Sequence, residues 1–187
     1  MFNKDPSKHE IEEELKKRGD FIQIDYLSRI LKKDTPFEIK KFVLSKLSEI
    51  YEKKKMFTDA AKTEYSLAII STSIGEKIKH HTNEAKLCIQ AGVFQRADEA
   101  MNKAIHHGNA IEKSQIYIEI KQFYKKLAED YEKEKKRNQA SKLYEKLMDM
   151  KISDIEKQEL KEKLLNSYDK LGKTKEYFAL KKSGEKV

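Results

Sequence analysis

The stretch YKKLAEDYEKEKKRNQASKLYEKL, residues 124–147, decides the fold. Its first half places large side chains at Tyr124 and Leu127 and a small one at Ala128, with the three- and four-residue spacing of one helix face. Its second half places an aromatic side chain four residues after Ala140. Small residues let two helices cross closely, while large residues fill the space around the crossing. The stretch therefore predicts two helices packed against each other.

The same pattern recurs, with deviations, in three further parts of the chain. In the first, Tyr65 and Ala68 fall one residue late, which predicts an irregular helix. In the second, Glu84 stands where a large apolar side chain is expected, and in the last Tyr177 takes the small position. Terminal repeats commonly deviate in this way. The matching positions are Leu44, Leu47, Ser48, Tyr51, Phe57 and Ala60, then Ala85, Cys88, Gly92, Phe94, Ala97, Met101 and Ala104, then Leu164, Leu165, Tyr168 and Gly172.

These motifs resemble the tetratricopeptide repeat, a helix pair that stacks on its neighbours. Tyr51, Cys88, Tyr131 and Tyr168 are separated by 37, 43 and 37 residues, more than the roughly 34 of the standard repeat. The chain is similar in this respect to divergent relatives with longer helices, such as the soluble NSF attachment proteins. The resemblance covers about residues 40–183. It implies an all-α fold, a right-handed solenoid of stacked antiparallel helix hairpins with about 9 to 10 helices and no sheet.

Capping signals predict where individual helices begin. Asp5, followed by proline, is typical of the start of a first helix. Thr35 with Glu38 and Ser153 with Glu156 have the spacing of capping boxes, in which the two side chains satisfy free backbone amides. Connections of two or three residues would make neighbouring helices antiparallel.

Glycines predict where several helices end, because a left-handed C-terminal cap favours glycine. The glycines that follow amphipathic runs are Gly75, Gly92, Gly108 and Gly172. The expected helices after the first span about residues 20–33, 36–54, 57–73, 76–91, 94–107, 110–135, 138–150, 153–171 and 174–183. We expect residues 1–35 to pack on or cap the array formed by residues 36–187, within a single compact domain.

The composition suits a thin stack of helices, with 38% hydrophobic and 39% charged residues. The net charge of +8 is spread along the chain, and only four of the 40 basic residues are arginines. Because arginine dominates the specific recognition of phosphate and guanine, lysine-rich solvated faces explain the charge best. Any binding of nucleic acid is expected to be weak and non-specific.

The sequence contains no indication of an enzyme, a cofactor or a membrane span. It lacks a glycine-rich phosphate loop, a cluster of metal-binding cysteines and the signatures of hydrolase nucleophiles. Cys88, the single cysteine, occupies a core position of the repeat and is expected to be a buried thiol. No signal peptide is indicated, so a reducing cytoplasm is the expected location.

Histidines offer the one candidate for a metal site. His80 and His81 lie near the start of one expected helix, and His106 and His107 lie near the end of the next. An antiparallel hairpin would bring the two pairs together, although adjacent histidines on a helix point about 100° apart and an acidic third ligand is not obvious. We therefore favour solvated or half-packed histidines and predict no metal.

The resemblance implies that the first helix of each hairpin lines a concave surface that binds another protein or peptide. An alternative is a basic helical protein that binds RNA or a ribonucleoprotein. The sequence leaves the partner and the oligomeric state open. The predicted partner-binding residues are Phe42, Ser45, Glu49, Lys79, Thr82, Asn83, Lys86, Gln122, Lys125, Lys126 and Glu129.

Overall fold

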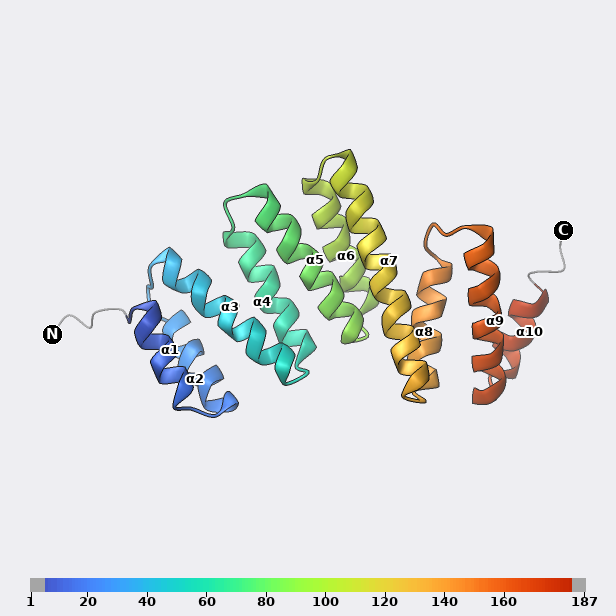
Figure 1. Cartoon of the computed structure of the whole chain (residues 1–187), viewed down its shortest axis with the longest axis horizontal. Helices are drawn as coiled ribbons and strands as arrows, with labels where there is room; N and C mark the ends of the chain where they lie inside the picture. The colour runs from blue at the N-terminus through green and yellow to red at the C-terminus, as the bar shows by residue number, and fades with distance from the viewer. Residues whose placement is uncertain (1–5, 183–187) are drawn as a thin grey trace. The chain divides into compact units, whose positions relative to one another are not determined.

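The chain folds into α-helices joined by connections of two to five residues. The computed structural model describes residues 6–182, and no strand occurs within that range (Figure 1). The predicted all-α fold is confirmed. The helices of this range are α1 (Lys8–Lys16), α2 (Asp20–Leu31), α3 (Phe37–Lys53), α4 (Phe57–Ile70), α5 (Ile74–Gln90), α6 (Phe94–His107), α7 (Ala110–Lys133), α8 (Arg137–Met148), α9 (Asp154–Leu171) and α10 (Thr174–Lys182).

The helices form two compact units that divide within α7, between residues 116 and 117. The sequence predicted one compact domain, whereas the structure has two units. The first unit includes α1 and α2, which share a core with α3. In that core Ile11, Leu27 and Val43 are fully buried.

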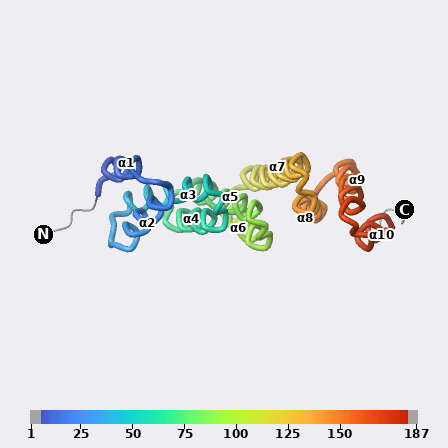
Figure 2. The backbone as a smooth tube through the Cα atoms, turned by 90° about the horizontal axis from the view of Figure 1, so that it is seen from below, coloured from blue at the N-terminus to red at the C-terminus, as the bar shows by residue number. Residues whose placement is uncertain are grey.

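Within each unit the helices alternate between two layers. In the first unit α3 and α5 lie in one layer and α4 and α6 in the other (Figure 2). α4 packs against both α3 and α5, and α5 packs against α6. Side chains as small as methyl groups allow these close crossings. The fully buried alanines of this unit are Ala60, Ala61, Ala85, Ala100 and Ala104.

In the second unit α9 packs against both α8 and α10. Ala128 and Ala140 are fully buried, as the alternation of small and large residues predicted. Tyr144 is also fully buried, and its hydroxyl donates a hydrogen bond of 2.7 Å to Glu132. α10 packs on α9, although no side chain of α10 is buried and Phe178 remains 53% exposed.

One predicted helix start needs correction. Thr35 and Glu38 form no capping box, because α3 begins after a proline without a side-chain cap and the Glu38 carboxylate lies 3.1 Å from the Lys8 ammonium. The first helix is capped by Ser7, which forms a capping box with Glu10. The predicted cap at position 5 lies outside the described residues.

The helix ends agree better with the prediction. Gly92 and Gly172 follow their helices with φ of 72° and 67°, the left-handed region that favours glycine. Ser153 forms the predicted capping box. Gly75 does not end a helix, because Ser73 caps α5 and this glycine therefore lies in the first helical turn.

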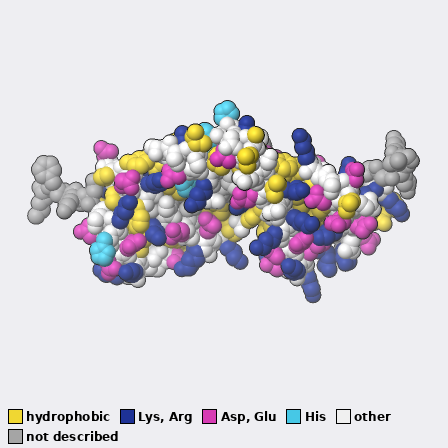
Figure 3. All heavy atoms as spheres, turned by 45° about the horizontal axis from the view of Figure 1, so that its top comes forward, with side chains coloured by type: hydrophobic (Ala, Val, Ile, Leu, Met, Phe, Trp, Pro, Cys, Tyr) yellow, Lys and Arg dark blue, Asp and Glu magenta, His cyan; other side chains and the backbone are white. Residues whose placement is uncertain are grey.

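On the face of each unit that Figure 3 shows, charged side chains of both signs are interspersed. Within residues 6–182 no helix combines the length and hydrophobicity that a bilayer crossing requires.

Candidate functional site

A cavity of about 430 Å³ lies in the second unit between α7 and α9, and we refer to it as the α7–α9 groove. Two long helices supply most of its surface, while α8 and the connection before α9 supply one residue each. Its volume is within the range that binds a small ligand or a few side chains. The lining residues are Ile118, Lys121, Gln122, Lys125, Leu147, Ile152, Glu156, Glu159, Leu160 and Lys163.

The inner surface of the α7–α9 groove is apolar. Leu147 and Leu160 are only 2% and 6% exposed, and Ile152 is half-buried beside them. Ile118 lines the same cavity but is 48% exposed, which is high for a large aliphatic side chain. A ligand that covered Ile118 would remove this apolar surface from water.

Two ion pairs bridge the α7 and α9 walls. The Lys121 ammonium lies 3.1 Å from the Glu156 carboxylate, and the Lys163 ammonium lies 3.4 Å from the Glu129 carboxylate. Hydrogen bonds from the backbone of Ser153 and from Lys121 lower the pKa of Glu156 below its usual value. The first bridge is therefore anchored to the capping box of α9.

Between these bridges the two walls carry unpaired charges. Lys125 on α7 and Glu159 on α9 both line the cavity and are exposed. Within the described part of the chain neither takes part in an ion pair. They are therefore the charges of the α7–α9 groove that are available to a ligand.

The residues around the α7–α9 groove have equivalent positions in the first unit, because the chain repeats its helix boundaries at a constant offset, the one that relates position 41 to position 121. α4, α5 and α6 begin at residues 57, 74 and 94, and α8, α9 and α10 begin at residues 137, 154 and 174. Lys55 and Lys135 share an unusual left-handed backbone with φ of 57° and 59°. Identical residues at this offset include Lys41 and Lys121, Tyr51 and Tyr131, Ala60 and Ala140, Leu67 and Leu147, Ser73 and Ser153, Glu76 and Glu156, and Gly92 and Gly172.

The first ion pair of the α7–α9 groove is reproduced at these equivalent positions. The Lys41 ammonium lies 2.5 Å from the Glu76 carboxylate, again between the first helix of one hairpin and the capped start of the next. The repeat thus preserves this side-chain contact as well as the helix boundaries. One spacing of 37 residues and one of 43 together equal the offset between positions 41 and 121, so the repeating unit is two hairpins long. The resemblance to a shorter repeat of one hairpin did not reveal this longer unit.

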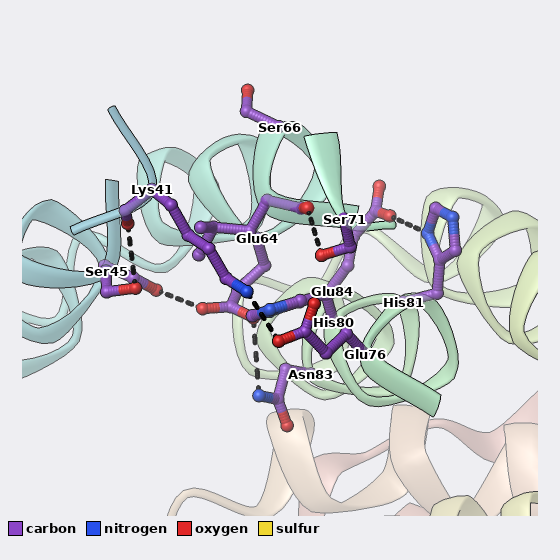
Figure 4. A network of polar contacts seen from close by, with 12 residues as sticks. Lys41, Ser45, Glu64, Ser66, Ser71, Glu76, His80, His81, Asn83 and Glu84 are labelled. Atoms are coloured by element: carbon purple, nitrogen blue, oxygen red, sulfur yellow. Dashed lines mark hydrogen bonds and ion pairs between the residues drawn. The ribbon is translucent and has the colours of Figure 1, made fainter. Parts of the chain in front are cut away.

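In the first unit, the buried side chains beneath the surface that corresponds to the groove are polar, and we call them the Glu64 layer (Figure 4). The Glu64 carboxylate on α4 accepts hydrogen bonds from the Ser48 hydroxyl at 2.7 Å and from the Asn83 amide at 3.3 Å. His80 Nδ1 lies 2.9 Å from the same carboxylate. Glu64 is only 5% exposed. Burial raises its pKa, but hydrogen bonds from His80 and Ser48 outweigh burial, so the pKa of Glu64 lies below its usual value.

The corresponding layer of the second unit is largely apolar. Tyr144 takes the place of Glu64, Ala128 that of Ser48, and Leu160 that of His80. Lys163, the counterpart of Asn83, places its ammonium 5.3 Å from the centre of the Tyr144 ring. The two units therefore support equivalent surfaces by different chemistry.

This layer also explains a wrong prediction about α4. The helix is regular from Phe57 to Ile70, so it contains no irregularity that would realign Tyr65. Glu64, four residues after Ala60, occupies the aromatic position of the repeat, and Tyr65 is 39% exposed. A carboxylate held by three hydrogen-bonding partners replaces the expected ring.

The predicted histidine pairs do approach each other. The rings of His81 and His107 have centres 6.0 Å apart and planes inclined by 6°. His81 Nδ1 lies 3.0 Å from Glu84, the carboxylate at an apolar position of the repeat. Within residues 6–182 there is no group of three or more histidine, cysteine or acidic side chains that could hold a metal ion.

The structure places the predicted partner-binding residues of the first unit in different environments. Thr82 is 4% exposed and lies outside the open surface, and the Asn83 amide is engaged by Glu64. Phe42 packs partly against the core, and Ser45 donates to the Lys41 carbonyl. Lys86 is half-buried, whereas Glu49 and Lys79 are exposed.

In the second unit Gln122 and Lys125, two of the predicted partner-binding residues, line the α7–α9 groove. Lys126 is exposed without lining it, and Glu129 forms the second bridge. The sequence prediction omitted the whole α9 wall. Comparison of the sequence with models of known protein families gave no match, and comparison with curated proteins gave none either.

Proposed function

We propose that the protein is a non-catalytic scaffold that binds a segment of a partner protein in the α7–α9 groove. The observation that carries this proposal is the groove itself. Its apolar interior is partly open to water at Ile118, and it lies between two walls with unpaired charges. Apolar pockets with a few directed polar groups are the usual form of ligand sites.

The proposed architecture is a solenoid similar to tetratricopeptide repeats. The alternating layers of each unit, the buried alanines at the crossings and the repeated hairpins support it. In such an array the first helices of successive hairpins line one surface, and α7 and α9 are two of them. The buried free thiol of Cys88 is compatible with the reducing cytoplasm that we propose as the location.

The alternative function, RNA binding, lacks a comparable feature. Lysines that could form a phosphate-binding track are interspersed with acidic side chains (Figure 3), and several of them pair with carboxylates. Neutralising adjacent phosphates needs a continuous basic surface. We therefore favour a protein partner.

A pull-down from lysate of the cells that make the protein would test the proposal. The bait would be the full chain, its Ile118→Asp variant and its Ile155→Asp variant, each with and without nuclease. Ile155 is 75% exposed on α9 but does not line the groove, so it is a matched control. A partner in the groove should be retained by the wild type and by Ile155→Asp, lost with Ile118→Asp, and unaffected by nuclease.

Two outcomes would contradict the proposal. Loss of all bound proteins after nuclease treatment would favour the RNA-binding alternative. Equal retention by both variants would show that the groove does not hold the partner.

A further inference from the structure

We infer that the α7–α9 groove binds an internal segment of a partner protein, about three or four residues long. This segment inserts one large apolar side chain and places a carboxylate beside Lys125. The inference rests on the proposed function. The inference concerns the chemistry of the segment. It follows from the length of the open site, from its interior and from its charges.

The two bridges limit the length of the segment. Lys121–Glu156 and Glu129–Lys163 join the walls at points eight residues apart on α7, or about 12 Å at 1.5 Å per residue. An extended chain advances about 3.3 Å per residue, so about three or four residues fill this window. Because a bridge closes each end of the window, a chain lying along the groove passes over both bridges and continues on both sides. A chain terminus is not required.

The interior selects an apolar anchor. Leu147, Ile152 and Leu160 form a surface without a hydrogen-bonding side chain, and Ile118 extends it to the solvent. A polar side chain inserted there would lose its hydrogen bonds to water without compensation. A large aliphatic or aromatic side chain would be accepted.

The unpaired charges determine on which side of the groove a carboxylate of the segment lies. Lys125 on the α7 wall attracts a carboxylate, while Glu159 on the α9 wall repels a second one. Such charges contribute more to orientation and specificity than to affinity. The net charge of +8 also favours the approach of an acidic partner.

The first unit provides an internal contrast. At the offset between the two copies, the counterparts of Ile118, Ile152 and Leu160 are Glu38, Thr72 and His80. Lys125 and Glu159 correspond to Ser45 and Lys79. Of the apolar interior the first unit therefore keeps only Leu67, the counterpart of Leu147, and it lacks this arrangement of charges. The apolar anchor is specific to the second unit.

The experiment is selection from a phage-displayed library of random 12-residue peptides, which are fused to coat protein and so present no free carboxyl terminus. The targets are the full chain and its Lys125→Glu variant. Enriched peptides are then labelled, and their dissociation constants are measured by fluorescence polarisation with the wild type, Ile118→Glu, Leu160→His and Ile155→Asp. Circular dichroism confirms that each variant is folded.

We expect the wild type to enrich a large apolar residue within three positions of Asp or Glu, and Lys125→Glu to replace that acid by Lys or Arg. Binding should weaken at least about tenfold with Ile118→Glu and Leu160→His, and should be unchanged with Ile155→Asp. Because Ile118 is exposed, its variant tests the groove even if Leu160→His fails to fold.

The contrary outcomes are distinguishable. Enriched peptides without an apolar anchor would overturn this inference and leave the scaffold proposal intact. Peptides that bind Ile118→Glu as well as the wild type would show binding outside the groove and would overturn both. Unchanged acids in the Lys125→Glu selection would overturn the assignment of the carboxylate. Failure to enrich any peptide would overturn both the inference and the proposed function.

Discussion

Replacement of Glu64 by alanine should destabilise the first unit by about 2–4 kcal/mol. The structural reason is the loss of one buried acceptor shared by Ser48, His80 and Asn83. His80 and Asn83 are half-buried and can exchange this acceptor for water, whereas Ser48 is 3% exposed. Leaving the Ser48 hydroxyl without a partner costs about 1–3 kcal/mol, and the cavity left by the truncation adds about 1 kcal/mol.

The apolar layer of the second unit suggests a compensating variant. Ser48→Ala, Glu64→Tyr and His80→Leu together install the side chains found at the equivalent positions of the second unit. Replacing a buried polar group and its buried partners by well-packed apolar groups is often neutral, and the half-buried Asn83 can bond to water instead. The triple variant should therefore recover most of the lost stability.

Hydrogen exchange of the α3, α4 and α5 amides is the appropriate assay. The chain has two compact units, so a single unfolding free energy for the whole molecule is not well defined. Glu49→Ala, at an exposed position of α3, is the control and should change exchange little. A Glu64→Ala effect below about 1 kcal/mol, or a triple variant as unstable as Glu64→Ala, would refute the reasoning.

Further predictions concern pH, packing, the C-terminal helix and nucleic acid. Burial and the charges of His81 and Lys77 lower the pKa of His107 below its usual 6.5, so the unfolded chain binds this proton first and stability should fall as the pH drops through 6.5. Thermal melts from about pH 8 to pH 5 would show a weaker dependence for His107→Asn, and an identical dependence would contradict this. Ala128→Leu or Ala140→Leu should cost about 1–3 kcal/mol by overpacking, whereas exposed Ala179→Leu should not; three equal melting temperatures would exclude close crossings at these alanines. Deletion of residues 174–187 should expose Leu164 and Tyr168, lower the melting temperature and increase self-association in sedimentation; an unchanged melt with loss of a partner would instead identify α10 as a docking strip. Fluorescence anisotropy with a short RNA should show weak binding that disappears near physiological salt, and tight binding there would favour the RNA-binding alternative.

The sequence predicted the helices well because their limits depend on local signals. Short connections and the left-handed glycines at residues 92 and 172 depend little on distant contacts. The burial of Ala128 and Ala140 followed from the alternation of small and large residues. The capping box predicted at Thr35 does not form, because its acidic partner lies beside a lysine of α1, a contact between residues 30 positions apart.

The candidate site was only partly predictable. Gln122 and Lys125 were identified because they lie on a helix with a strong repeat signature. The α9 wall was missed because the predicted surface stopped at the third hairpin. The Glu64 layer was also missed, because burial of a carboxylate depends on donors from α3 and α5 that local propensity does not reveal.

The gapless offset between the two copies has a consequence for chain length. Since turns, caps and crossings coincide without insertion or deletion, a junction made at equivalent points of the two copies would leave every later element in phase. A chain in which residue 50 is followed by residue 131 would join α3, up to its last turn, to the last residues of α7 as one helix, with Ser48 at the crossing that Ala128 makes in the second unit. Removal of the intervening segment in this way should therefore yield a shorter folded protein rather than a broken one. The chain could therefore be shortened or lengthened by whole units of two hairpins.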